Sequence, residues 1–193
     1  LCQCDGAGAR NTHGHLRPLG LQPVDVASRG ASKEAPPLHS LTRGIDIPPS
    51  WLALHIGAAS LVSLVSPAVF GAVGRAFGLG MVGLGVLVMI AAVAQMSLAR
   101  TTVIPRRNPS ALVTTGLFGL SRNPIYLADA VILTGAILWL DAVVALPLIF
   151  SFVWLIQTRF IRDEEARLTL AFGPEFDLWA ARTRRWFGRK SGV

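Results

Sequence analysis

The residues best suited to chemistry lie in two short polar stretches, each at the end of an apolar run. In the first, Arg122 and Asn123 directly precede Pro124, and Tyr126 follows two residues later. An arginine guanidinium binds carboxylates and phosphates through paired hydrogen bonds, and the free N–H groups of a helix N-terminus attract the same anions. The second stretch contains the adjacent carboxylates Glu164–Glu165, which suit a cation or sugar hydroxyls. Together the stretches fit a zwitterionic ligand that carries an amine, a carboxylate and a ribose.

Asp129 follows Tyr126 by three positions, inside the next apolar run. Residues three apart share a helix face, and an ionisable side chain within a membrane segment is a functional candidate by default. Asp129 is therefore a candidate for a substrate-side catalytic role, and pairing with an arginine is the structural alternative. A structural interpretation also stays open for the polar stretches: Arg122 and Tyr126 as interfacial anchors, and Glu164–Glu165 as the wet face of an amphipathic helix. His55 is interpreted as a hydrogen-bonded packing residue.

The composition indicates an integral membrane protein. Of the 193 residues, 52% are hydrophobic and only 15% are charged, and the mean hydropathy is +0.52. Soluble domains carry about 25% charged residues. The net charge is +7, but the basic residues flank apolar runs, which is typical of membrane topology and of contact with anionic lipid head groups. No nucleic-acid-binding module is recognisable, so no nucleic-acid partner is predicted.

We expect an all-α, multi-pass integral membrane protein with about four transmembrane helices and C-terminal interfacial amphipathic helices. The expected spans are residues 51–70, 77–99, 124–140 and 142–158, and the amphipathic helices are residues 160–172 and 175–187. The first break is placed near Arg75, the only formal charge between Trp51 and Ala99. Lysine and arginine counts put both termini and the 100–123 loop on the cytoplasmic side. The expected location is a bacterial inner membrane.

This organisation divides the chain into three parts. Residues 1–47 are expected to be a disordered tail or the product of a mis-called start, residues 48–99 to hold two spans, and residues 100–190 to form the functional core with two further spans and a C-terminal cap. The tail contains two cysteines and two nearby histidines, but their spacing fits no zinc module, and no metal site is predicted: Cys2, Cys4, His13 and His15.

One glycine motif requires a separate interpretation. Gly78, Gly80 and Gly83 match the dinucleotide fingerprint G-x-G-x-x-G, which needs a strand before it and a helix after it. The motif here starts an apolar span instead. It is therefore interpreted as a helix-packing surface of small residues.

Several short motifs recur in a characteristic order over residues 97–187. They are Thr115-Gly116-Leu117-Phe118, Ser121-Arg122-Asn123-Pro124-Ile125-Tyr126, Arg162-Asp163-Glu164-Glu165, Phe172-Gly173 and Arg184-Arg185-Trp186. In this combination the chain resembles the isoprenylcysteine carboxyl methyltransferase and phospholipid methyltransferase superfamily. It departs from the usual pattern at Gly119, where a basic residue is common, and at Ala128, where a glycine is usual.

The resemblance implies an S-adenosylmethionine pocket at the cytosolic membrane face. Asn123, Pro124 and Tyr126 would shape one wall of this pocket. Glu164–Glu165 would hold the polar end of the cofactor, and Gly173 would let the C-terminal helix fold over it.

The expected activity is an S-adenosylmethionine-dependent methyl transfer, with Arg122 and Asp129 in catalytic roles. The acceptor would be lipophilic, either the carboxylate of a prenylated cysteine-like group or a lipid head group, and the other partners are membrane lipids. Two alternatives stay open. One is a membrane-embedded reductase of related fold that uses a nicotinamide cofactor, and the other is a non-enzymatic small membrane protein.

Overall fold

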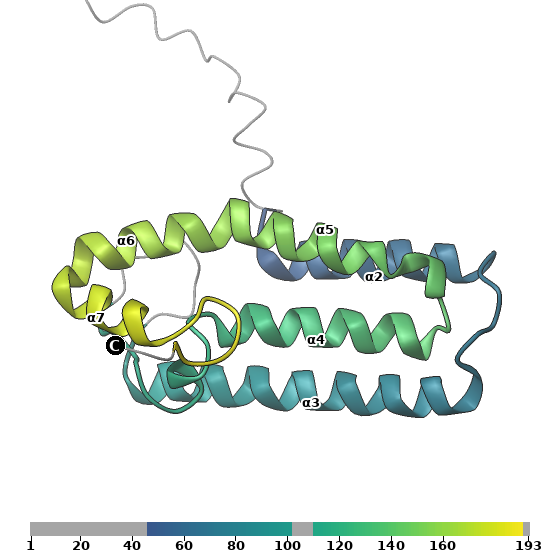
Figure 1. The fold of residues 1–193 in the computed structure, drawn as a ribbon, viewed down its shortest axis with the longest axis horizontal. Coiled ribbons are helices and arrows are strands. Elements are labelled where there is room, and N and C mark those ends of the chain that lie inside the picture. Colours follow the sequence, from purple (N-terminus) through teal and green to yellow (C-terminus); the bar gives the residue numbers. More distant parts are fainter. Residues whose placement is uncertain (1–45, 102–109, 191–193) are drawn as a thin grey trace, which may run out of the picture. The chain divides into compact units, whose positions relative to one another are not determined.

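The computed structural model describes residues 46–101 and 110–190, and this part of the chain is helical (Figure 1). The α-helices are α2 (Pro48–Ser63), α3 (Gly71–Leu98), α4 (Pro124–Trp139), α5 (Pro147–Ile156), α6 (Arg162–Phe172) and α7 (Pro174–Arg182). Short 3₁₀ turns occupy Gly116–Gly119 and Val143–Ala145, and a π-helical turn at Gln157–Ile161 joins α5 to α6. The predicted all-α class is confirmed for these residues. The predicted tail, with its cysteines and histidines, lies outside them except for Asp46 and Ile47.

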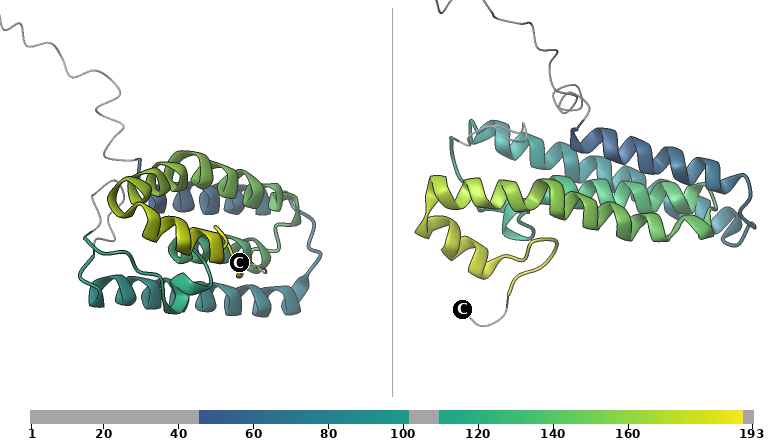
Figure 2. Two further views of the ribbon diagram at one scale, coloured as in Figure 1. Left: turned by 60° about the vertical axis from the view of Figure 1, so that its left-hand side comes forward. Right: turned by 90° about the horizontal axis from the view of Figure 1, so that it is seen from above.

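Helix α4 is central, because it packs against α3 on one side and against α2 and α5 on another (Figures 1 and 2). Two glycines allow the closest approach. A Cβ built on Gly78 would lie 2.5 Å from the backbone oxygen of Gly135, and one built on Gly135 would lie 2.6 Å from the oxygen of Gly78. The packing role expected for Gly78 is thus confirmed. The same glycine motif does not pack along its whole length, since a Cβ at Gly80 or Gly83 would meet no atom within 4 Å.

The break between α2 and α3 falls earlier than the predicted position near Arg75. The Asp141 carboxylate accepts hydrogen bonds from the backbone N–H groups of Val69, Phe70 and Gly71, at 3.0, 2.8 and 3.0 Å. These donors have no partner within a helix that starts here, so a distant carboxylate fixes the start of α3. Arg75 consequently lies inside the first turns of α3. The predicted bounds 51–70 and 77–99 were wrong at this break.

Helices α5 and α6 form one continuous helix through the π-turn, where two separate helices were predicted. The prediction ended the span at Arg159. That side chain donates from Nε to Oδ1 of Asp46 at 2.7 Å and lies over the ring of Trp51, 5.6 Å from its centroid. The charge is therefore paired beside the helix and does not end it.

Two helices are long and apolar enough to cross a membrane, namely α3 and the continuous helix Val143–Phe172. Helix α4 is apolar but has only 16 residues. The predicted count of about four spans is not confirmed.

The chain reverses at Gly173, as predicted. Gly173 has φ +49°, a conformation that glycine adopts without strain, and Pro174 starts α7. Helix α7 ends at Arg182 and not at the predicted residue 187, because residues 182–190 form a hairpin in which Thr183 and Arg189 pair as an antiparallel bridge. Figure 2 shows α7 running back beside α6.

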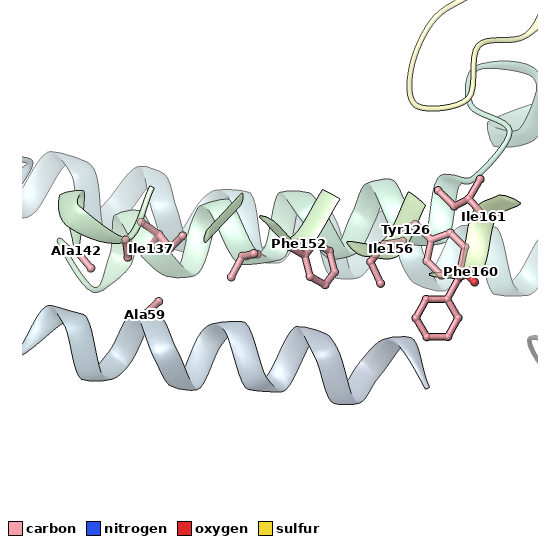
Figure 3. Close-up of a cluster of buried hydrophobic side chains, with 10 residues drawn as sticks. Ala59, Tyr126, Ile137, Ala142, Phe152, Ile156, Phe160 and Ile161 are labelled. Atoms are coloured by element: carbon pink, nitrogen blue, oxygen red, sulfur yellow. The ribbon is translucent and has the colours of Figure 1, made fainter. Parts of the chain in front are cut away.

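The main apolar core lies between α2, α4 and α5 (Figure 3). Phe152 lies near its middle, and Ala59 and Ile137 lie toward one end. Tyr126 and Phe160 lie together at the other end, with ring centroids 6.5 Å apart. His55 is buried beside this core and is hydrogen-bonded to the Trp51 carbonyl (2.8 Å) and the Ser151 hydroxyl (3.1 Å). The packing role expected for His55 is confirmed. The core ends where the polar residues of the predicted site begin.

Candidate active site

A cavity of about 440 Å³ lies at the end of the bundle where α4 begins. Small-molecule sites commonly occupy about 300–1,000 Å³. The cavity is bounded by α3, α4, α6 and α7, by the start of α2 and by residues 111–118. Its polar side chains are Thr101, Arg122, Asn123, Tyr126, Asp129, Glu164 and Arg167. The opposite wall is apolar and includes Met89, Val93 and Met96 at helical spacing on α3.

The structure brings most of the predicted site residues together around this cavity. Those that line it are Arg122, Asn123, Pro124, Tyr126, Asp129 and Glu164. Two predicted residues, Glu165 and Gly173, are not among the lining residues. Sequence reasoning missed Arg167, although its position three residues after Glu164 places both on one helix face.

The start of α4 carries the polar groups that reach deepest. Pro124 occupies the first turn of α4, where a missing N–H costs nothing. Tyr126 and Asp129 follow on one face, and both side chains are buried. Tyr126 on α4 and the Glu164 carboxylate on α6 both line the cavity. Asp129 forms no ion pair with any residue of the described ranges, so the arginine pairing considered for it is not seen.

Arg122 lines the cavity, and one of its donors is buried in the protein without a partner. Its Nη2 lies 3.2 Å from Oε1 of Glu165, but its buried Nε has no hydrogen-bond partner within the part of the chain that the structure describes. Burial lowers the pKa of Arg122 from its usual value, while Glu165 opposes this shift. A buried donor without a partner costs about 1–3 kcal/mol. Arg122 is held at the cavity wall by its ion pair with Glu165.

Glu165 is held by two arginines. Its Oε1 also accepts from Nε of Arg185 at 3.1 Å, and its Oε2 is in close contact with Nη2 of the same residue. Glu165 is 14% exposed, Arg122 13% and Arg185 33%, so the group is largely removed from water. Neighbouring residues on a helix point about 100° apart. The two carboxylates therefore face different partners, with Glu164 at the cavity and Glu165 at the arginines.

Hydrogen bonds fasten the C-terminal hairpin both to the segment before α4 and to the π-turn. The Arg122 backbone N–H donates to the carbonyl of Arg184 at 3.0 Å, and Asn123 donates from Nδ2 to the carbonyl of Arg185 at 3.1 Å. Trp186 donates from Nε1 to Oε1 of Gln157, in the π-turn, at 3.0 Å. Arg184-Arg185-Trp186 was part of the motif series, but the sequence carries no signal that links it to Gln157.

Helix α7 covers one side of the cavity. Its Trp179 donates from Nε1 to the carbonyl of Phe118 at 3.0 Å and packs against Phe176, with ring centroids 5.8 Å apart. Trp179 and Phe118 both line the cavity. Gly173 takes no part in the lining, but its positive φ produces the reversal that brings α7 here.

Comparison with known proteins agrees with this arrangement. The chain matches the phospholipid methyltransferase family over residues 73–175, a range that includes most of α3, all of α4 and Glu164 and Glu165 of α6. No curated protein and no solved structure matches the chain. The match covers more than half of the sequence and bears out the resemblance noted in the motif order. The chain belongs to the phospholipid methyltransferase family, whose members are membrane methyltransferases.

Proposed function

We propose that the protein transfers a methyl group from S-adenosylmethionine to a lipophilic acceptor at the membrane. The observation that carries this proposal is that one cavity has carboxylates and Arg122 on one side and the apolar α3 wall on the other. A soluble, charged cofactor and an apolar acceptor need these two environments in contact. Family membership supports the reaction class.

The residues present fit S-adenosylmethionine. The guanidinium of Arg122 suits the carboxylate of its amino-acid part. Glu164 suits the amine or the ribose hydroxyls, and Asn123 and Pro124 form the adjacent wall. When bound, this cofactor supplies a methyl group made electrophilic by the sulfonium. Glu165 contributes through Arg122, which it holds in place by an ion pair.

The remaining residues align the reaction partners and control water and protons. Tyr126 and the Glu164 carboxylate form the polar part of the cavity between α4 and α6. Helix α7 and Phe118 shield the cavity from water, which strengthens the electrostatic interactions inside it. Asp129 is placed to accept the proton that an amine acceptor loses, whereas a carboxylate acceptor would need no base. Met89, Val93 and Met96 would contact the apolar part of the acceptor.

For the membrane arrangement, we propose four crossings, with α2 and α4 added to the two long apolar helices. Both termini and the cavity would then face the cytoplasm of a bacterial cell. The arginines that cluster at the cavity end of the bundle support this orientation, because cytoplasmic loops carry an excess of basic residues.

The direct test uses purified protein in lipid nanodiscs. Calorimetry should detect S-adenosylmethionine binding, and labelled cofactor followed by lipid extraction should place the methyl group in a lipid. Glu164→Gln should weaken cofactor binding about 10–100-fold, the usual value of a hydrogen bond to a charged group. Glu175→Gln, an exposed carboxylate on α7, is the matched control and should bind as the wild type does.

The alternatives predict different results. A reductase would be protected against thermal unfolding by a nicotinamide cofactor and not by S-adenosylmethionine. A non-enzymatic membrane protein would be protected by neither. Folded wild-type protein that fails to bind S-adenosylmethionine would refute the proposal.

A further inference from the structure

The C-terminal hairpin, residues 182–190, is a compact unit that projects charged side chains. Its backbone is closed by hydrogen bonds from Arg184 N to Gly188 O (2.9 Å) and from Lys190 N to Arg182 O (2.8 Å). Gly188 makes the turn with φ +98°, a conformation that side chains rarely adopt. The hairpin therefore has a defined shape, and the direction of its side chains is fixed by its backbone.

The hairpin is strongly basic. Five of its nine residues are arginine or lysine and none is acidic. Arg185 points inward to Glu165, whereas Arg182, Arg184, Arg189 and Lys190 are exposed. Within residues 46–101 and 110–190, no carboxylate forms an ion pair with the three exposed arginines. These cations are therefore available to bind an anionic partner outside the chain.

Apolar side chains lie exposed beside these cations. Phe187 in the hairpin is 67% exposed and Leu178 on α7 is 60% exposed. A surface that combines basic side chains with exposed aromatic and aliphatic ones suits the interface of an anionic bilayer. A nucleic acid or an acidic protein would meet the cations equally well but would leave this apolar surface unexplained.

The backbone of the same hairpin holds the cavity wall. Gly188 N donates to the carbonyl of Leu120 at 2.8 Å, and the carbonyls of Arg184 and Arg185 accept from Arg122 and Asn123. Whatever fixes the hairpin therefore also fixes the segment that carries the cavity residues Arg122 and Asn123.

We propose that the C-terminal hairpin docks on an anionic lipid surface and that this docking tightens the cavity wall at residues 120–123. The charge of the surrounding lipid would thereby regulate the site. The effect on methyl transfer rests on the proposed function, but the docking and the tightening do not.

The test is amide hydrogen exchange of the full-length protein in two kinds of nanodisc, one of phosphatidylcholine and one with about a third phosphatidylglycerol. Anionic lipid should slow exchange in peptides that cover the amides of Arg122 and Gly188. Each basic residue near an anionic surface contributes about 1 kcal/mol, which is about fivefold in an equilibrium constant. Replacing Arg182, Arg184 and Arg189 by Gln should therefore remove most of the lipid dependence.

Controls separate the proposal from its competitors. Arg75→Gln removes one exposed charge outside the hairpin and should keep the full lipid dependence. High salt should weaken the effect, because exposed charges are screened over about 10 Å at 0.1 M. Three results would overturn the proposal. The first is an exchange rate that does not depend on lipid charge, and the second is a lipid dependence that is unchanged by the triple substitution. The third is that heparin in neutral nanodiscs protects these amides as well as anionic lipid does. Protection that follows lipid charge while no lipid supports methyl transfer would leave the docking standing and would refute the proposed function instead.

Discussion

Glu165→Gln should destabilise the fold far more than its neighbour Glu164→Gln, although the two residues are adjacent. Glu165 neutralises both Arg122 and Arg185, and all three side chains are largely buried. The substitution keeps the shape of the side chain but leaves two guanidinium groups close together without a counter-charge. Glu164 has no such pairing and lines the cavity.

The size of the effect follows from burial. Removing one partner of a buried ion pair costs about 3–5 kcal/mol, because a charge is left without compensation. Arg185 is 33% exposed and keeps some hydration, so we expect a cost near the lower limit, about 3 kcal/mol. For a chain of this length, 1 kcal/mol corresponds to about 2–4 °C in Tm, so Tm should fall by about 6–12 °C.

The assay is thermal unfolding of both variants in the same nanodiscs, combined with a double-mutant cycle that adds Arg122→Gln. Removing Arg122 from the Glu165→Gln protein should cost less than removing it from the wild type, since one buried unpaired charge disappears. Residues that do not interact give additive effects within about 0.3–0.5 kcal/mol. An unchanged Tm in Glu165→Gln, or additivity in the cycle, would refute the assignment of Glu165 as the residue that positions Arg122.

Two further predictions concern the opposite end of the bundle. Gly78→Ala should lower the free energy of unfolding by about 1–3 kcal/mol, because its Cβ would meet backbone atoms of α4 at 2.5 Å. Gly83→Ala should leave the free energy of unfolding unchanged, since its Cβ would meet open space. Thermal unfolding in nanodiscs compares the two variants. Hydrogen bonds from the backbone, that of Phe70 first, lower the pKa of Asp141. The contribution of the Asp141 carboxylate to folding stability is therefore complete above the usual carboxyl pKa, about 3.9. It is lost as the pH falls through the lower pKa that Asp141 has in the folded protein. The Tm difference between wild type and Asp141→Asn should be constant from about pH 5 to 8 and narrow below about pH 4, and a difference independent of pH would contradict this assignment.

The sequence predicted the helical class, the position of α4 and the gathering of most site residues, because these depend on local patterns. Pro124 marks a helix start by its own chemistry, and Gly173 with Pro174 marks a reversal in the same way. The start of α3 was mispredicted because it depends on Asp141, about 70 residues away. The separate roles of the two carboxylates were also missed. Only the placement of Arg185 beside α6 shows that Glu165 is already occupied.

The π-turn Gln157–Ile161 explains how one helix serves both the core and the cavity. A π-turn inserts one residue, which rotates the following helix by about 100° relative to an unbroken α-helix. Before the turn, Phe152 faces the core; after it, Glu164 faces the cavity. Within the turn, Gln157 accepts from Trp186 and Phe160 packs on Tyr126, so the irregular geometry is fixed by contacts on both sides. An α-helical register through this segment would turn Glu164 away from the cavity, which would lose this carboxylate.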